Sequence, residues 1–236
     1  QIGKEQSLLP ASHLNIAIGP LVQAWRIGFS DARIPNNAEV THALSLTDPQ
    51  LIELDPLSCT VFLAKEGMKL DLGCLAKGYI ADKIADYLKS QHVRSALINL
   101  GGNIKTIGNN ALADRPWQIG IQDPRQPRGT NLAVLPICNQ SVVTSGTYER
   151  KLQVNEHTYH HILDRKTGYP VDTQLASITI ISDNSLDGEI WTTRLYGEKP
   201  RQLLTRVEQE KGIEALIVTT DNRVYYSSGI SPEFLA

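Results

Sequence analysis

Short stretches of alternating apolar and polar residues recur along this chain, separated by glycine and Asx turns, and they constrain its fold most. Residues 96–100, 117–122 and 175–182 carry the pattern most clearly and are predicted to be strands. Residues 78–92 have apolar side chains at helical spacing instead. Because hairpin signals recur between the helical stretches, the pattern favours α+β over a doubly wound parallel sheet.

The weaker patterns complete this prediction. Further strands are expected at 60–64, 68–71, 133–138, 141–144, 215–219 and 223–226, with turns at 65–67, 139–140 and 221–222. Further helices are expected at 189–196 and 200–212, a buried turn or helix at 13–28, and short helical or loop pieces at 40–45 and 49–53. We therefore predict a single α+β domain spanning 1–236, with mixed, largely antiparallel sheets and flanking helices.

Charge and cysteine content exclude several classes of function. The net charge is −2 with both signs interspersed, so no basic surface for nucleic acid is expected. No apolar run approaches the roughly 20 residues that span a bilayer. The cysteines, Cys59, Cys74 and Cys138, lack metal-ligand spacing and are expected to be buried thiols.

Two segments concentrate the residues that could carry chemistry. Residues 159–170 read YHHILDRKTGYP and combine two imidazoles, a carboxylate and a turn. Residues 144–150 read TSGTYER and place hydroxyls beside a glycine that lets the backbone approach a ligand. Together they indicate chemistry on a phosphorylated or acyl substrate.

Both segments resemble signature stretches of the ApbE-type flavin transferases, the FAD:protein FMN transferases, and the resemblance extends over nearly the whole chain. The other matching stretches, in the family's order, are LNIAIGPLV at 14–22 with Trp25, LDLGCLAKGY at 70–79 with Asp82, INLGGNI at 98–104 and WQIGIQDP at 117–124. The resemblance implies an ApbE-like fold and an FAD-binding, magnesium-dependent enzyme. Such an enzyme transfers FMN from FAD to a threonine or serine hydroxyl of a partner protein and releases AMP.

The resemblance also implies the catalytic base. His161 aligns with the histidine of the family's His-Ile-hydrophobic-Asp-Pro-x-Thr-Gly motif, and imidazole is suited to proton transfer near neutral pH. We expect His160 to point the other way, and Arg165 occupies the position of the motif's proline. A rival interpretation makes Ser145, His161 and Asp164 a hydrolase triad, although the Gly-x-Ser-x-Gly elbow is absent.

The residues expected to bind FAD follow from the same resemblance. They are His13, Leu14, Asn15, Asp71, Lys77, Thr144, Ser145, Gly146 and Ile162. From the residues alone, Asp71 could equally cap a helix, Lys77 could be a solvated charge, and Gly101 and Gly102 could form a plain turn.

The expected magnesium ligands are the backbone carbonyl of Cys74 and the carboxylate of Asp187. In the family an aspartate and a threonine four residues later bind the metal, but Trp191 stands at the second position here. Thr192 comes one residue late, so it substitutes only if the helix start is distorted. Three alternatives stay open: water completes the coordination, Glu189 or Thr192 replaces the ligand, or the chain binds flavin without transferring it.

The resemblance further predicts an acceptor protein carrying an Asp-small-x-Thr motif. Two competing functions are an FAD pyrophosphatase, which yields FMN and AMP, and a flavin-binding or electron-transfer module. Family members usually extend further at the N-terminus and are often exported and lipid-anchored. We therefore expect a segment before Gln1 and assign no compartment.

Overall fold

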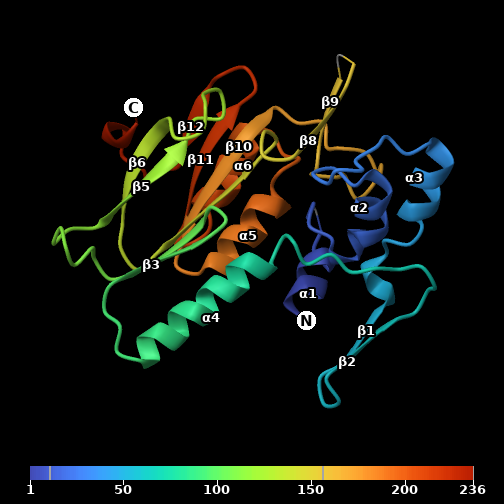
Figure 1. The fold of residues 1–236 in the computed structure, drawn as a ribbon, viewed down its shortest axis with the longest axis horizontal. Coiled ribbons are helices and arrows are strands. Elements are labelled where there is room, and N and C mark those ends of the chain that lie inside the picture. The colour runs from blue at the N-terminus through green and yellow to red at the C-terminus, as the bar shows by residue number, and fades with distance from the viewer. Residues whose placement is uncertain (11, 156, 236) are drawn as a thin grey trace. The chain divides into compact units, whose positions relative to one another are not determined.

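A computed structural model describes residues 1–10, 12–155 and 157–235, which form two compact units (Figure 1). The first unit contains residues 1–74, 147–173 and 194–197, and the second contains the remaining segments. Both units are therefore assembled from segments distant in sequence. The single domain stays a prediction.

The first unit contains short helices and two small antiparallel ribbons. Its helices are α1 (Ile2–Leu8), α2 (Gly19–Trp25) and α3 (Asn37–Leu44), with 3₁₀ turns at Ile16–Ile18 and Pro49–Leu51. One ribbon pairs β1 (Ile52–Asp55) with β2 (Thr60–Leu63), and the other pairs β8 (Lys151–Val154) with β9 (His157–His160). A core of α2, α3 and loop residues, including the 1%-exposed Trp25, holds the helices together.

The second unit is built on a six-stranded antiparallel sheet of order β12-β11-β10-β7-β4-β3. The strands are β3 (Ala96–Leu100), β4 (Asn103–Ile107), β7 (Ser141–Gly146), β10 (Leu175–Ser182), β11 (Ile213–Thr219) and β12 (Val224–Tyr226). A separate ribbon pairs β5 (Trp117–Gln122) with β6 (Asn131–Ile137). Three helices belong to this unit: α4 (Ala76–Ser90), α5 (Ser185–Arg194) and α6 (Pro200–Glu208), with a 3₁₀ turn at Pro232–Phe234.

Strand alternation gives the sheet two apolar faces. One face packs Val142, Ile181 and Leu216 against the β5–β6 ribbon. The opposite face packs Ile98 and Ile107 against α4. Both faces are thus covered, which explains why the central strands β7 and β10 are almost entirely buried.

Several predicted elements are confirmed, as is the α+β class. Strands β3, β5 and β10 have the predicted bounds, and α4 lies within two residues of its predicted ends. The terminal hairpin of β11 and β12 is also present. These segments have strong local periodicity and clear turn residues at their ends.

Two local predictions are wrong. The expected hairpin around 65–67 does not form, because β2 pairs with the upstream strand β1, and residues 68–71 are irregular. The expected helix 189–196 instead begins at Ser185 and ends at Arg194. The thiol prediction also needs correction: Cys59 is exposed, and Cys74 and Cys138 are only partly buried.

Candidate active site

The loop that carries His161, residues 161–169, rests on Trp25 in the first unit. The indole Nε1 donates to the carbonyl oxygen of Gly168 at 2.9 Å. Tyr159 and Tyr169 lie against the same ring, with centroid distances of 5.5 and 5.6 Å. The helix expected within residues 13–28 is therefore α2, and Trp25 anchors the loop.

Asp164 organises the turn inside this loop. Its Oδ1 accepts hydrogen bonds from the backbone N–H of Lys166 at 2.6 Å and of Thr167 at 3.4 Å, an Asx turn. Gly168 has a φ of 76°, and an added Cβ would lie 2.7 Å from Val40 Cγ1. Glycine is thus required here both by its backbone angle and by space.

The two histidines of the motif differ in environment. His161 Nδ1 lies 3.3 Å from the carbonyl oxygen of Arg150. Since a carbonyl only accepts, a hydrogen bond at this contact needs its proton on Nδ1, and a neutral ring would then carry its lone pair on Nε2. His160 is half-buried, its Nε2 lies 3.0 Å from the carbonyl of Val171, and burial lowers its pKa. These contacts give His160 a structural role, and the role of His161 as a base stays a prediction.

The segment of residues 12–15, here termed the His13 segment, packs beside the chain that follows α5. The His13 N–H donates to the Arg194 carbonyl at 3.2 Å. A Cβ on Gly197 would lie 2.2 Å from His13 Cε1, so the imidazole packs directly on this glycine. Leu14 is fully buried. The absence of a side chain at Gly197 thus leaves room for the His13 imidazole.

Asn15 has a structural role as well. It is 4% exposed, its Oδ1 accepts from Ala17 N, and its Nδ2 donates to Thr47 O at 2.8 Å. The amide therefore caps a 3₁₀ turn and ties it to residue 47. Contact of Leu14 and Asn15 with FAD stays a prediction.

Asp71 and Cys74 end the first contiguous segment of this unit. Asp71 Oδ1 accepts from Gly73 N at 2.7 Å, and Asp71 N donates to Ile16 O at 2.8 Å. Asp71 therefore stabilises a turn and does not cap α4, whose N-cap residue is Leu75. Ile162 pairs with Val171 through its carbonyl. The roles of Asp71, Ile162 and the Cys74 carbonyl toward FAD and metal stay predictions.

In the second unit, Lys77 is held by a buried carboxylate. Its Nζ lies 2.6 Å from Glu189 Oε1 and 3.1 Å from Asn103 Oδ1. Asn103 Nδ2 also donates to Glu189 Oε1 at 2.7 Å. The Glu189 side chain is 4% exposed and that of Lys77 is 45% exposed, so the ammonium still reaches solvent. Lys77 is therefore an oriented charge and not a freely solvated one.

The start of α5 is set by residues of α4. Asp82 accepts hydrogen bonds from the N–H groups of Ser185 at 2.8 Å and Leu186 at 2.9 Å, which caps α5 with a negative charge. A Cβ on Gly78 would lie 2.5 Å from Ser185 O, so the two helices approach at this glycine. This close approach brings Lys77 to Glu189.

The helix α5 starts regularly, and this start sets the positions of the residues in the expected metal motif. Asp187 lies in the first turn and Trp191 one turn later, and Thr192 Oγ1 donates to the Glu189 carbonyl at 3.0 Å. Thr192 and Glu189 Oε1 thus already have intramolecular partners. Among the described residues there is no group of three or more His, Cys, Asp or Glu side chains that could hold a metal. Besides Glu189, α5 carries one carboxylate, Asp187, and a single protein carboxylate would fit an ion that retains waters and binds substrate phosphates, so the magnesium site stays a prediction.

Thr144, Ser145 and Gly146 are the last residues of β7. Thr144 Oγ1 lies 2.8 Å from Thr179 Oγ1, on the sheet face covered by the β5–β6 ribbon. Ser145, the next residue, faces the helices, since adjacent strand residues point to opposite faces. The two hydroxyls therefore face different surroundings, and their contact with FAD stays a prediction. The rival triad gains no support, because Asp164 binds the turn and His161 Nδ1 faces a carbonyl.

Gly101 and Gly102 form the turn between β3 and β4. Both have positive φ, 60° and 99°, and an added Cβ would meet nothing within 4 Å at either. The backbone angles alone explain these glycines, as in a tight hairpin turn.

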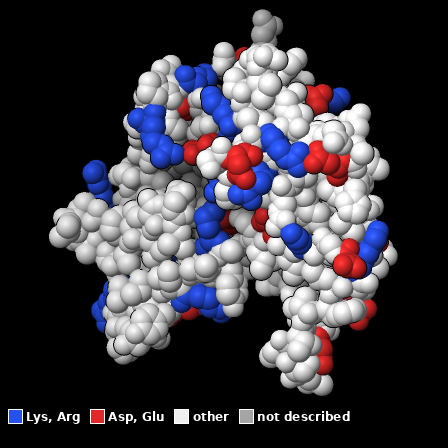
Figure 2. All heavy atoms as spheres, turned by 45° about the vertical axis from the view of Figure 1, so that its right-hand side comes forward, with Lys and Arg blue, Asp and Glu red and all other residues white. Residues whose placement is uncertain are grey.

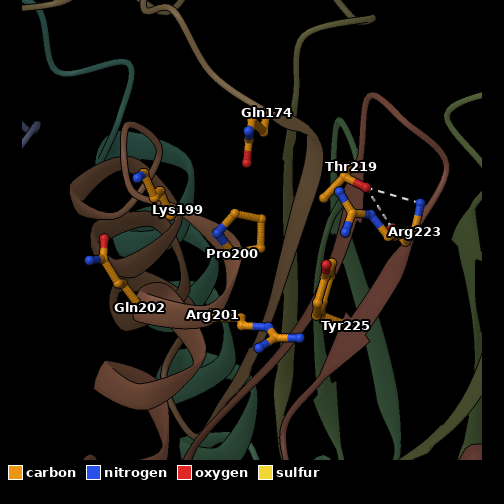
Figure 3. Close-up of a pocket in the computed structure, with 8 residues that line it drawn as sticks. All are labelled: Gln174, Lys199, Pro200, Arg201, Gln202, Thr219, Arg223 and Tyr225. Atoms are coloured by element: carbon orange, nitrogen blue, oxygen red, sulfur yellow. Dashed lines mark hydrogen bonds between the residues drawn. The ribbon is translucent and has the colours of Figure 1, made fainter.

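A pocket of about 240 Å³ opens in the second unit between the start of α6 and the strands β11 and β12 (Figure 3). It is lined by Gln174, Lys199, Pro200, Arg201, Gln202, Thr219, Arg223 and Tyr225. None of the sequence-predicted site residues lines it. Basic and acidic side chains are interspersed on the face drawn in Figure 2. No membrane-spanning helix is found in the described part of the chain.

Comparison with known proteins identifies the class of fold and site. The ApbE family matches residues 1–217, so this chain belongs to the ApbE family. It is 46% identical over 228 residues to an FAD:protein FMN transferase of Klebsiella pneumoniae and 36% identical to one of Treponema pallidum. The predicted family membership is confirmed.

Solved structures show the same fold. The ApbE protein of Thermotoga maritima superposes with a TM-score of 0.85 at 28% identity, covering 100% of this chain and 76% of that one. The flavinyl transferase ApbE of Pseudomonas stutzeri gives 0.80 at 26% identity, covering 100% and 73%. The match to the Klebsiella protein covers 97% of this chain and 70% of that protein. The match to the Treponema protein covers 92% of this chain and 63% of that protein. It thus spans about two thirds of the length of these relatives.

Proposed function

We propose that this chain binds FAD and transfers FMN from it to a threonine or serine hydroxyl of an acceptor protein, with release of AMP. The observation that carries the proposal is similarity, over nearly the whole chain, to proteins named FAD:protein FMN transferase. Transfer is favoured over hydrolysis or simple flavin carriage because the named relatives are transferases.

The reaction forms a bond between the acceptor oxygen and the flavin-side phosphorus of the FAD pyrophosphate. The bond from this phosphorus to the oxygen bridging to AMP breaks, and AMP leaves with the electron pair. The hydroxyl proton goes to a base, for which His161 Nε2 is suited because its Nδ1 faces the Arg150 carbonyl. Lys77, oriented by Glu189 and Asn103, is proposed to contact the pyrophosphate.

Magnesium is proposed as the metal, with Asp187 and the Cys74 carbonyl as protein ligands. When bound, it would offset negative charge on the phosphate oxygens. We expect a chelator to lower AMP release and magnesium to restore it, while Asp187→Ala makes the residual rate insensitive to chelator. A wild-type rate that is unchanged by chelator contradicts the metal role.

The first experiment incubates the purified chain with FAD and magnesium, with and without a peptide carrying Asp-small-x-Thr. AMP together with a peptide heavier by one FMN supports transfer. AMP with free FMN indicates a pyrophosphatase, and bound intact FAD indicates a carrier. Either of the last two outcomes overturns the proposal.

The base is tested separately. We expect His161→Ala to lower AMP release by at least about 100-fold, the usual contribution of a general base, while FAD still binds. His160→Gln is the matched control and should change the rate far less, since His160 is bonded to the backbone. Equal losses in the two variants contradict the assignment.

A further inference from the structure

We propose that Arg165 is a positioning residue that fastens the His13 segment to the His161 loop and thereby prepares the chain to bind FAD. The inference rests on the proposed function, because the segment matters only if it contacts FAD. Its structural part concerns contacts within the first unit alone.

Three backbone carbonyls converge on one guanidinium nitrogen. Arg165 Nη1 lies 2.7 Å from Ser7 O, 3.1 Å from Leu14 O and 3.2 Å from Ser12 O. These acceptors are more than 150 residues away in the sequence, where α1 ends and the His13 segment begins. A single side chain of the loop therefore ties together both parts of the N-terminal region.

These carbonyls belong to buried residues. Ser7 and Leu14 are 0% exposed and Ser12 is 6% exposed, so water has little access to them. A buried carbonyl without a donor costs free energy, and a charged donor makes a stronger hydrogen bond than a neutral one. Lysine cannot reproduce the planar guanidinium, which donates from fixed directions.

Other hydrogen bonds also hold the His13 segment, among them that of Asn15 Nδ2 to Thr47 O at 2.8 Å. His13 N donates to Arg194 O at 3.2 Å, and Leu14 N donates to Ser12 Oγ at 3.2 Å. Ile16 N donates to Ser7 Oγ at 2.9 Å, so Ser7 links α1 to the segment as well as to Arg165. Removing the guanidinium would leave these neutral contacts to hold the segment.

The position explains why this matters for FAD. Arg165 follows Asp164, whose turn shapes the His161 loop, and it is found where the family motif has a proline. A proline would stiffen the loop but could not bind the His13 segment. In this chain the residue after Asp164 therefore couples the proposed base to the proposed FAD contact at His13.

The test compares Arg165→Lys and Arg165→Ala with Arg33→Ala, an arginine of the same unit whose exposed pair with Glu39 lies away from this cluster. Amide hydrogen exchange of the FAD-free protein is measured at His13, Leu14 and Ile16. AMP release is measured against FAD concentration, with and without added guanidinium ion for the alanine variant.

We expect faster exchange at the three amides in both Arg165 variants. If the segment is docked only a tenth of the time, the apparent KM for FAD rises about tenfold, while kcat changes little. Guanidinium ion should restore much of the KM in Arg165→Ala, and Arg33→Ala should resemble the wild type.

Unchanged exchange in both variants overturns the inference, as does a loss confined to kcat that guanidinium does not rescue. If the wild type neither binds FAD nor releases AMP, the proposed function fails. The exchange data would then still decide whether Arg165 holds the segment.

Discussion

The pair of Lys77 and Glu189 should respond asymmetrically to substitution, because its two partners differ in exposure. Lys77→Met removes the cation from a carboxylate that is 4% exposed, and the donor that remains to it among the described residues is the Asn103 amide. Glu189→Gln leaves an ammonium whose side chain is 45% exposed and can turn to water. The lysine substitution should therefore be the more destabilising.

The magnitudes follow from burial. Breaking a fully buried pair costs about 3–5 kcal/mol, and the partial exposure of Lys77 reduces this to about 2 kcal/mol for Lys77→Met. Glu189→Gln keeps an acceptor for Asn103 and should cost about 0.5–1 kcal/mol, like a surface pair. With a urea m-value of about 3 kcal/mol/M, the midpoint should fall by about 0.7 M for Lys77→Met and by about 0.2–0.3 M for Glu189→Gln.

The assay is urea unfolding of both single variants, the double variant and Lys83→Met. Lys83 lies on the same helix, is 61% exposed and is 3.9 Å from Asp86, so its substitution should change stability by less than about 0.5 kcal/mol. The double variant should be more stable than Lys77→Met alone, since it has no buried carboxylate that lacks its cation. Equal midpoints for the single variants, or additive losses in the double variant, would refute the reasoning.

Two further predictions concern packing and pH. Gly78→Ala places a Cβ 2.5 Å from Ser185 O. The overpacking should cost about 3 kcal/mol, and the better helix propensity of alanine should recover about 1 kcal/mol. The unfolding free energy should therefore fall by about 2 kcal/mol. Thermal unfolding of Gly78→Ala is compared with that of the control Lys83→Ala, and equal stability of the two variants contradicts the prediction. Because burial lowers the pKa of His160 from its usual 6.5, the unfolded chain binds more protons below that pH. The unfolding free energy should therefore fall as pH drops from about 7.5 to 5.5, by at most about 1.4 kcal/mol per pH unit. The fall should be smaller in His160→Gln. Parallel profiles of unfolding free energy against pH in the two proteins contradict the prediction.

The sequence predicts those strands whose burial is decided locally. β3, β5 and β10 alternate clearly and end at turn residues. β4 lacks this alternation, because it contains Asn103 and Lys105, two polar residues that a sequence pattern assigns to the surface. Both are in fact buried, with exposures of 2% and 4%. Lys105 can be buried because its Nζ donates to the backbone carbonyls of Asp183 and Asn139, a long-range arrangement that a local pattern does not contain.

The candidate site divides in the same way. The motifs predict roles for His161, Lys77 and Asp187, but several contacts that hold motif residues in place come from distant parts of the chain. Glu189 is 112 residues from Lys77, and Ser7 is 158 residues from Arg165. Asp82 is part of a matching stretch, yet its role in capping α5 appears only when two helices are placed together. Residue type predicts which groups could react, whereas tertiary contacts decide which are held in place.

The metal motif shows how such a contact bears on one condition set by the sequence, the distorted helix start that Thr192 would need. Thr192 could replace the absent threonine only if α5 began irregularly. Asp82 bonds the first two N–H groups of α5, so the helix is regular from Ser185 onward and Trp191 lies one turn after Asp187. The Thr192 hydroxyl is then directed to the Glu189 carbonyl and not to the side of the helix that bears Asp187. In the proposed magnesium site, α5 would therefore contribute Asp187, and the remaining ligands would come from water, substrate phosphates or groups outside this helix.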